Sequence, residues 1–115
     1  MKNRPETQAP ASEIEVDLVT IDDIVTELQL SRVDFVKMDI EGAERNALKG
    51  AIETLRRFQP ALAIATENLP DDIHVLPRII HEAVPGYRQT NGRCLRIQPT
   101  IIRPEVVYFQ AVRLS

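Results

Sequence analysis

At 115 residues the chain is long enough for one small domain, and its 43% hydrophobic and 27% charged residues exclude the composition of a disordered protein. The net charge of −3 argues against nucleic acid as a partner, because proteins that bind its phosphates usually carry a basic face. No apolar run approaches the roughly 18 residues of a membrane span, and the single cysteine, Cys94, cannot form an internal disulfide. We therefore expect a soluble, cytoplasmic domain with neither a membrane nor a nucleic-acid partner.

The chain opens on a polar segment. Residues 1–13 lack a sustained apolar period, which predicts a flexible N-terminal lead-in. Apolar residues then alternate through residues 14–19, a pattern typical of a short extended segment with one buried face. Thr20 is a suitable N-cap for a helix that ends near Leu30, because apolar residues recur there at helical spacing.

The middle of the chain carries the clearest structural signal. Residues 33–40 and 61–66 are short apolar-rich runs of strand length, and residues 42–58 between them form an amphipathic helical pattern. Gly50 lies inside this helical pattern, where a missing side chain permits close packing on a sheet. Strand, helix and strand in this order predict a right-handed βαβ unit with parallel strands.

The C-terminal part is predicted to be mostly extended. A further helix is expected to begin near Pro77, because proline is tolerated in the first turn of a helix and not in its interior. Residues 87–90 and 93–98 flank an Asn-Gly pair, which predicts an antiparallel hairpin, and residues 105–112 read as the last strand. The fold class is therefore α/β: parallel strands with flanking helices and a C-terminal antiparallel hairpin.

Three charged residues stand out where the first strand of this unit ends. Lys37, Asp39 and Glu41 alternate, so on an extended strand they would all point to one side. Ligands of open α/β sheets bind at the carboxyl ends of the strands, which favours a polar cavity at this edge. Asp39 or Glu41 taken alone is equally well explained as a cap of the following helix.

At these residues the sequence resembles a known family. The run VDFVKMDIEGAERNALKGAIETLRRFQPALAIATE is similar to the core signature of FkbM-family methyltransferases, a strand ending in K-x-D-x-E-G-x-E, a helix with L-x-G-A, and a second strand ending in glutamate. The preceding VDLVTIDDIVTEL resembles the lead-in of the same family. The likeness is close over residues 14–67 and loose elsewhere, and it implies that residues 14–115 are the C-terminal portion of a Rossmann-like methyltransferase domain.

The resemblance also implies an activity. Members of this family use S-adenosylmethionine, mostly to methylate oxygen, and a small-molecule or sugar hydroxyl is the expected acceptor. By this resemblance Asp39 and Glu41 are the catalytic candidates, and Asp39 would orient or deprotonate the acceptor hydroxyl. The substrate-facing candidates are Lys37, Glu44 and Glu67. Glu44 would either bind the acceptor or fix the loop. Glu67 would either line the same edge or be a solvent-exposed residue at the end of its strand.

The sequence departs from the family in one respect. Its four glycines, Gly42, Gly50, Gly86 and Gly92, do not form the glycine-rich loop that lets a backbone approach the cofactor, so the cofactor-binding residues stay unidentified. We therefore expect a truncated fragment that needs a complementing N-terminal half.

Two other functions remain open. A non-catalytic α/β interaction module, with a homo-oligomer as one option, would use the surfaces left uncovered by a missing half. A magnesium-assisted hydrolase would use Asp39, Glu41 and Glu44 as ligands. The histidines His74 and His81 lack partners at ligand spacing, so no bound metal is expected from them, and Cys94 is interpreted as a small hydrophobic residue.

Overall fold

The computed structural model describes residues 18–92, 94–98 and 101–112 of the chain. In order along the chain, its elements are α1 (Ile21–Glu27), β1 (Phe35–Met38), α2 (Glu44–Lys49), α3 (Ile52–Phe58), β2 (Ala61–Ala65), α4 (Asp72–Ala83), β3 (Tyr87–Asn91), β4 (Cys94–Gln98), β5 (Ile101–Pro104) and β6 (Val106–Ala111). The predicted lead-in of residues 1–13, the start of the extended segment before α1 and the side chain of Cys94 lie outside what the structure describes.

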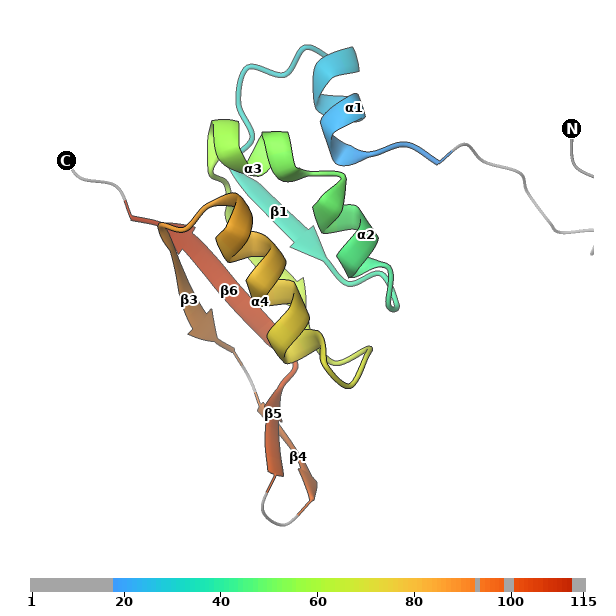
Figure 1. Cartoon of the computed structure of the whole chain (residues 1–115), viewed down its shortest axis with the longest axis vertical. Helices are drawn as coiled ribbons and strands as arrows, with labels where there is room; N and C mark the ends of the chain where they lie inside the picture. The colour runs from blue at the N-terminus through green and yellow to red at the C-terminus, as the bar shows by residue number, and fades with distance from the viewer. Residues whose placement is uncertain (1–17, 93, 99–100, 113–115) are drawn as a thin grey trace, which may run out of the picture.

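A four-stranded sheet in the order β1-β2-β6-β3 organises the domain. Strand β1 runs parallel to β2, as predicted for a βαβ unit, while β6 is antiparallel to both β2 and β3. Helices α2, α3 and α4 lie on one face of this sheet (Figure 1). The core is the layer between them, where apolar residues of the strands meet those of the helices: Met38, Leu62, Ile64, Val107 and Phe109 from the sheet, and Leu48, Leu55, Leu76 and Ile80 from the helices.

The opposite face of the sheet carries no helix in the described part of the chain. Phe35 pairs with Ala61 on β2, and Ala63 of the same strand pairs with Tyr108 on β6, so these four side chains share that face. Phe35 is 57% exposed and Tyr108 46% exposed, and a shallow groove of about 310 Å³ runs between them. We call this surface, defined by Phe35, Ala61, Ala63 and Tyr108, the open face.

The predicted helix of residues 42–58 is two helices, α2 and α3, and the prediction of one continuous helix is wrong. The break lies at Gly50 and Ala51. Gly50 approaches the segment before α1, since a Cβ atom on it would lie 2.9 Å from Cβ of Thr20. Its close packing is therefore against that segment and not against the sheet. The predicted N-cap is confirmed, because Oγ1 of Thr20 accepts a hydrogen bond of 3.0 Å from Asp23 N.

Helix α4 corrects another prediction. It begins at Asp72 and runs through Pro77, whereas the sequence predicted a start near the proline. Proline removes one hydrogen bond from a helix interior. Leu76 and Ile80 on either side of it are fully buried against the sheet, and this packing favours an uninterrupted helix.

The C-terminal hairpin exists, but it joins other strands than predicted. Strand β3 pairs with β6, and β4 pairs with β5 in a separate two-stranded sheet, so β3 and β4 do not form a hairpin. The Asn-Gly pair does not turn the chain because Asn91 belongs to β3 and Gly92 N donates to Val106 O at 2.8 Å. Gly92 is required there, since a Cβ atom on it would lie 2.8 Å from the Tyr108 ring.

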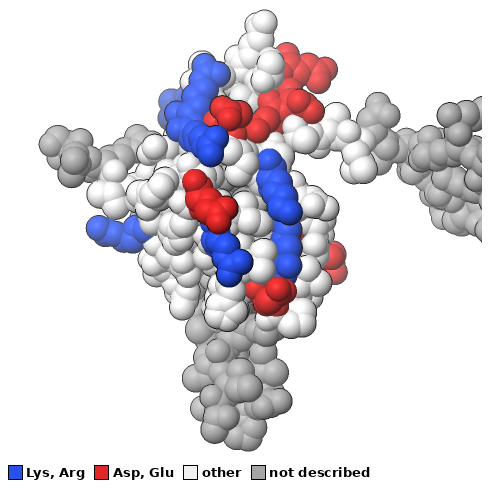
Figure 2. Space-filling model, in the orientation of Figure 1, with Lys and Arg blue, Asp and Glu red and all other residues white. Residues whose placement is uncertain are grey.

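The helix-covered side of the domain carries charges of both signs. Figure 2 shows that Lys and Arg side chains are interleaved with Asp and Glu side chains on this side, and neither sign gathers into one broad patch. Within the described residues, none of the helices has the length and apolar character needed to cross a membrane.

Candidate functional site

The acidic candidates follow two neighbouring strands. Asp39 and Glu41 come directly after β1, and Glu67 comes two residues after β2 ends at Ala65. Because β1 and β2 are parallel, with Met38 opposite Ile64, their carboxyl ends lie at the same edge of the sheet. All three carboxylates are exposed. The structure therefore brings the candidates to one edge and leaves them accessible.

The alternating row of Lys37, Asp39 and Glu41 is not formed. Strand β1 ends at Met38, and Glu41 adopts a left-handed backbone with φ of 59°, followed by Gly42 with φ of 100°. The chain has already turned, as Ala43 N donates to Ile40 O at 3.2 Å. Lys37 is exposed on the strand, and the three side chains do not line one polar cavity from a single strand face.

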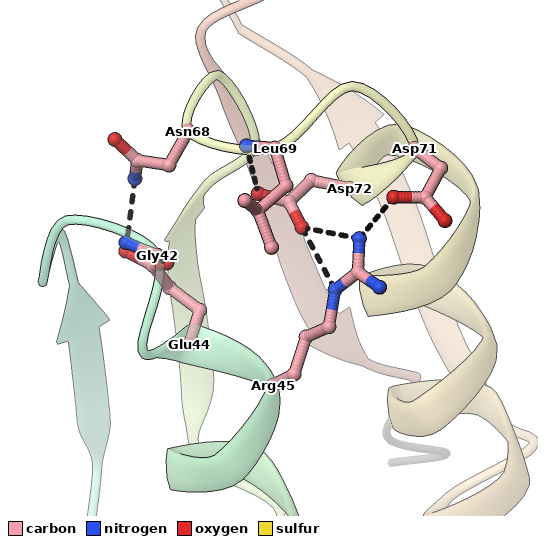
Figure 3. A network of polar contacts seen from close by, with 7 residues as sticks. All are labelled: Gly42, Glu44, Arg45, Asn68, Leu69, Asp71 and Asp72. Atoms are coloured by element: carbon pink, nitrogen blue, oxygen red, sulfur yellow. Dashed lines mark hydrogen bonds and ion pairs between the residues drawn. The ribbon is translucent and has the colours of Figure 1, made fainter.

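Glu44, the first residue of α2, carries a buried carboxylate, and 1% of the residue is exposed. Its Oε2 atom accepts a hydrogen bond of 2.7 Å from Ile40 N. The same Oε2 atom accepts one of 3.1 Å from Asn68 Nδ2, and its Oε1 atom accepts one of 3.1 Å from Gly42 N (Figure 3). Of the two roles open to Glu44 on the sequence, the structure supports fixing the loop. Its partners are backbone groups of the loop and an amide, and Lys37 is not among them.

Arg45, the next residue of α2, reaches the start of α4. Its guanidinium contacts Asp72, through Nε at 3.1 Å and Nη2 at 3.0 Å, and also pairs with Asp71 (Figure 3). Asp72 is 1% exposed and also accepts a hydrogen bond of 2.9 Å from Leu69 N. The hydrogen bond from Arg45 holds the pKa of the Asp71 carboxyl below its ordinary value, and that of the Arg45 guanidinium is raised in return.

No pattern in the sequence predicted a role for Asn68, Arg45 or Asp72. These residues belong to the connection between β2 and α4 or contact it, and Arg45 and Asp72 are 27 positions apart. No local pattern reveals such a pair. The position of Asn68 just after a strand of the βαβ unit was the signal available for it, because polar residues at that edge can reach the neighbouring loop.

We call residues 39–43, the loop between β1 and α2 that carries Asp39 and Glu41, the acidic loop. An apolar groove of about 480 Å³ lies beside it. Its walls include Leu18 and Val19 before α1, Ile40 between the two acids, and Ala43 and Ala47. Leu18 is 98% exposed and Ile40 is 43% exposed. The tripeptide 39–41 thus contributes an apolar side chain to this groove and carries a carboxylate on each side of it.

The described residues do not by themselves fit S-adenosylmethionine, the cofactor that the resemblance implies. Gly42 is the single glycine between β1 and α2, Gly50 packs on Thr20, and Gly92 packs on Tyr108, so no glycine-rich turn links a strand to a helix in the described part. Among the described residues, no group of three or more His, Cys, Asp or Glu side chains is placed to hold a metal ion. Asp39, Glu41 and Glu44, the magnesium ligands considered from the sequence, are therefore not gathered into such a group.

Comparison with known proteins gives two matches. The model of the methyltransferase FkbM domain family matches residues 2–89, which extends on both sides beyond residues 14–67. The crystal structure of methyltransferase FkbM from Methylobacillus flagellatus KT is similar, with 32% identity and a TM-score of 0.60. That likeness covers 77% of this chain and 22% of the other. Among curated proteins, none matches this sequence.

Proposed function

Because the chain belongs to the FkbM methyltransferase family, we propose that it forms the acceptor-binding portion of an S-adenosylmethionine-dependent enzyme that methylates a small-molecule or sugar hydroxyl. The observation that carries this proposal is the pair of accessible carboxylates, Asp39 and Glu41, on a loop at the carboxyl edge of two parallel strands. Ligands of open α/β sheets bind at this edge.

In this proposal Asp39 is the residue that handles the acceptor proton. Its carboxylate accepts a hydrogen bond from the acceptor hydroxyl, orients the oxygen and takes the proton when that oxygen is methylated. The carboxylate of Glu41, on the same loop, offers a second group that can accept a hydrogen bond from the substrate. Lys37 and Glu67 lie at the same edge, where they can contact polar groups of the substrate.

The apolar groove beside the loop supports an acceptor with an apolar part. Ile40 lines this groove and lies between the two acids in sequence, so a molecule seated there can present a hydroxyl to Asp39. Burial of the apolar part would supply binding energy of about 25 cal/mol per Å².

We further propose that the cofactor is held by polypeptide beyond the residues described here. The chain spans 22% of the length of its solved relative, and the described residues lack a glycine-rich turn. Methyl transfer would then require this chain together with the N-terminal portion of a family domain. Asp39 and Glu41 would be covered from solvent in that assembly, which strengthens their hydrogen bonds to the acceptor.

The test measures methyl transfer from labelled S-adenosylmethionine to a panel of small hydroxylated molecules and sugars. The full chain is assayed together with the N-terminal portion of a family domain. We expect Asp39→Asn to lower kcat about 100-fold or more, the usual contribution of a general base. Asp34→Asn is the matched control, because Asp34 is an exposed acid at the other end of β1. Equal activity of the Asp39→Asn variant and the parent would contradict the role of Asp39.

A second function, an α/β module that binds another polypeptide, is favoured by the outer edge of β1. Ala61 N donates to Asp34 O at 2.9 Å and Phe35 is opposite Ala61, so the backbone groups of Phe35 and Lys37 point away from β2. In the described part of the chain no strand pairs with that edge. A free strand edge next to an exposed phenylalanine is a surface suited to strand addition.

A further inference from the structure

We infer that Asn68 is a positioning residue of the candidate site, which fixes the loop that carries Asp39 and Glu41 by binding the carboxylate of Glu44. This inference rests on the proposed function, because the position of the loop matters for chemistry only if these acids bind the acceptor. Asn68 itself has no contact with the reacting atoms in this proposal.

The contacts of Glu44 join two loops that are distant in sequence. Two of its hydrogen bonds come from the loop after β1, from Ile40 N and Gly42 N. The third comes from the side-chain amide of Asn68, 24 residues away, in the connection after β2. Hydrogen bonds to a carboxylate are stronger than those between neutral groups. The buried carboxylate therefore acts as a fixed link between the two loops.

The backbone at Glu41 needs such a link. A left-handed conformation is unfavourable for a residue other than glycine, and Glu41 adopts it with φ of 59°. The amides of Ile40 and Gly42, on either side of Glu41, both donate to Glu44. Strain of this kind persists only where the surroundings hold it, so the hydrogen bonds of Glu44 select the conformation that displays Glu41.

A second set of contacts joins α2 to the connection after β2, so the role of Asn68 in positioning the loop can be tested without unfolding the domain. Arg45 binds Asp72, and Asp72 binds Leu69 N in the same connection after β2. Loss of the Asn68 amide leaves this ion pair and the apolar core in place. We therefore expect Asn68→Ala to fold and to release the acidic loop alone.

The test compares Asn68→Ala with Asn91→Ala, the same chemical change at an exposed position of β3, outside the groove beside the loop. In the full chain, we expect the backbone order parameters of residues 40–42 to fall from about 0.85 to below about 0.6 in Asn68→Ala only. Asn68→Asp, which places a second carboxylate beside Glu44, is expected to have at least as large an effect. Unchanged order parameters in both Asn68 variants would overturn the inference.

Kinetics provide the second readout. With the N-terminal portion supplied, we expect Asn68→Ala to lower kcat about tenfold while the KM for S-adenosylmethionine stays unchanged, since misplacement of a catalytic group affects the chemical step. A general loss of stability would not separate the two constants in this way. If the parent assembly transfers no methyl group, the proposed function fails, and the order parameters still decide the inference about Asn68.

Discussion

The ionisation of Tyr87 is coupled to folding. The residue is 5% exposed, its hydroxyl donates to Pro60 O at 2.6 Å, and its burial raises the pKa of Tyr87 from 10.0 to about 12. The folded state therefore holds this proton more tightly than the unfolded chain does. The stability that results is complete below pH 10 and is lost as the pH rises toward 12.

We accordingly expect Tyr87→Phe to lower the free energy of unfolding by about 1 kcal/mol at pH 8, through loss of one hydrogen bond. The variant should also lose less stability than the parent between pH 10 and 12. Urea unfolding across this pH range measures both effects. Tyr108→Phe is the control because Tyr108 is 46% exposed. A Tyr87→Phe variant with the same alkaline loss as the parent would contradict this account.

Among the elements, the junction of α1 with α3 depends on one carboxylate. Asp22 of α1 accepts hydrogen bonds from Thr54 N at 2.8 Å, Thr54 Oγ1 at 2.7 Å and Glu53 N at 3.1 Å. It therefore satisfies free amides in the first turn of α3, and Asp22 N in turn donates to Gly50 O at 2.8 Å. These bonds explain why the helical pattern of residues 42–58 is interrupted, because a second helix start is stabilised at this point.

Replacement of this acid should destabilise the domain. We expect Asp22→Ala to lower the free energy of unfolding by about 1–2 kcal/mol, the range for loss of a helix N-cap. Asp23→Ala is the matched control, since Asp23 is the adjacent acid of α1 and its side chain is exposed. Equal unfolding midpoints of the two variants in urea would show that the Asp22 contacts contribute nothing specific.

At the scale of the molecule, the described residues form a four-stranded sheet with helices on one face and a separate two-stranded sheet (Figure 1). Within this part of the chain, the other face of the larger sheet is open and the outer edge of β1 is unpaired. If the chain binds another polypeptide through β1, Phe35→Lys should prevent association, because lysine on an edge strand opposes strand addition. Tyr108→Lys places the same charge on the open face away from that edge and should have little effect.

Size-exclusion chromatography with light scattering distinguishes the two variants. We expect the parent chain to form a larger species at high concentration and the Phe35→Lys variant to stay monomeric. A parent that is monomeric at every concentration would count against self-association through this edge. Loss of association in the Tyr108→Lys variant alone would indicate that the interface is the open face and not the edge of β1.

The sequence was most informative where structure depends on neighbours along the chain. The period of apolar residues predicted β1, β2 and α1, with Thr20 as N-cap, because these patterns are local. The same region carried the family resemblance, and it placed Asp39 and Glu41 directly after strand β1. The fold class, the family and the position of the acidic loop were thus determined by sequence alone.

Only the tertiary structure decided which distant groups meet. The link from Glu44 to Asn68, the ion pair of Arg45 with Asp72, and the pairing of β3 with β6 join segments that no local period relates. Burial also overrode a local preference when α4 ran through Pro77. The physical reason is the same in each case: burial and hydrogen bonding between distant segments contribute more free energy than the propensity of a single residue.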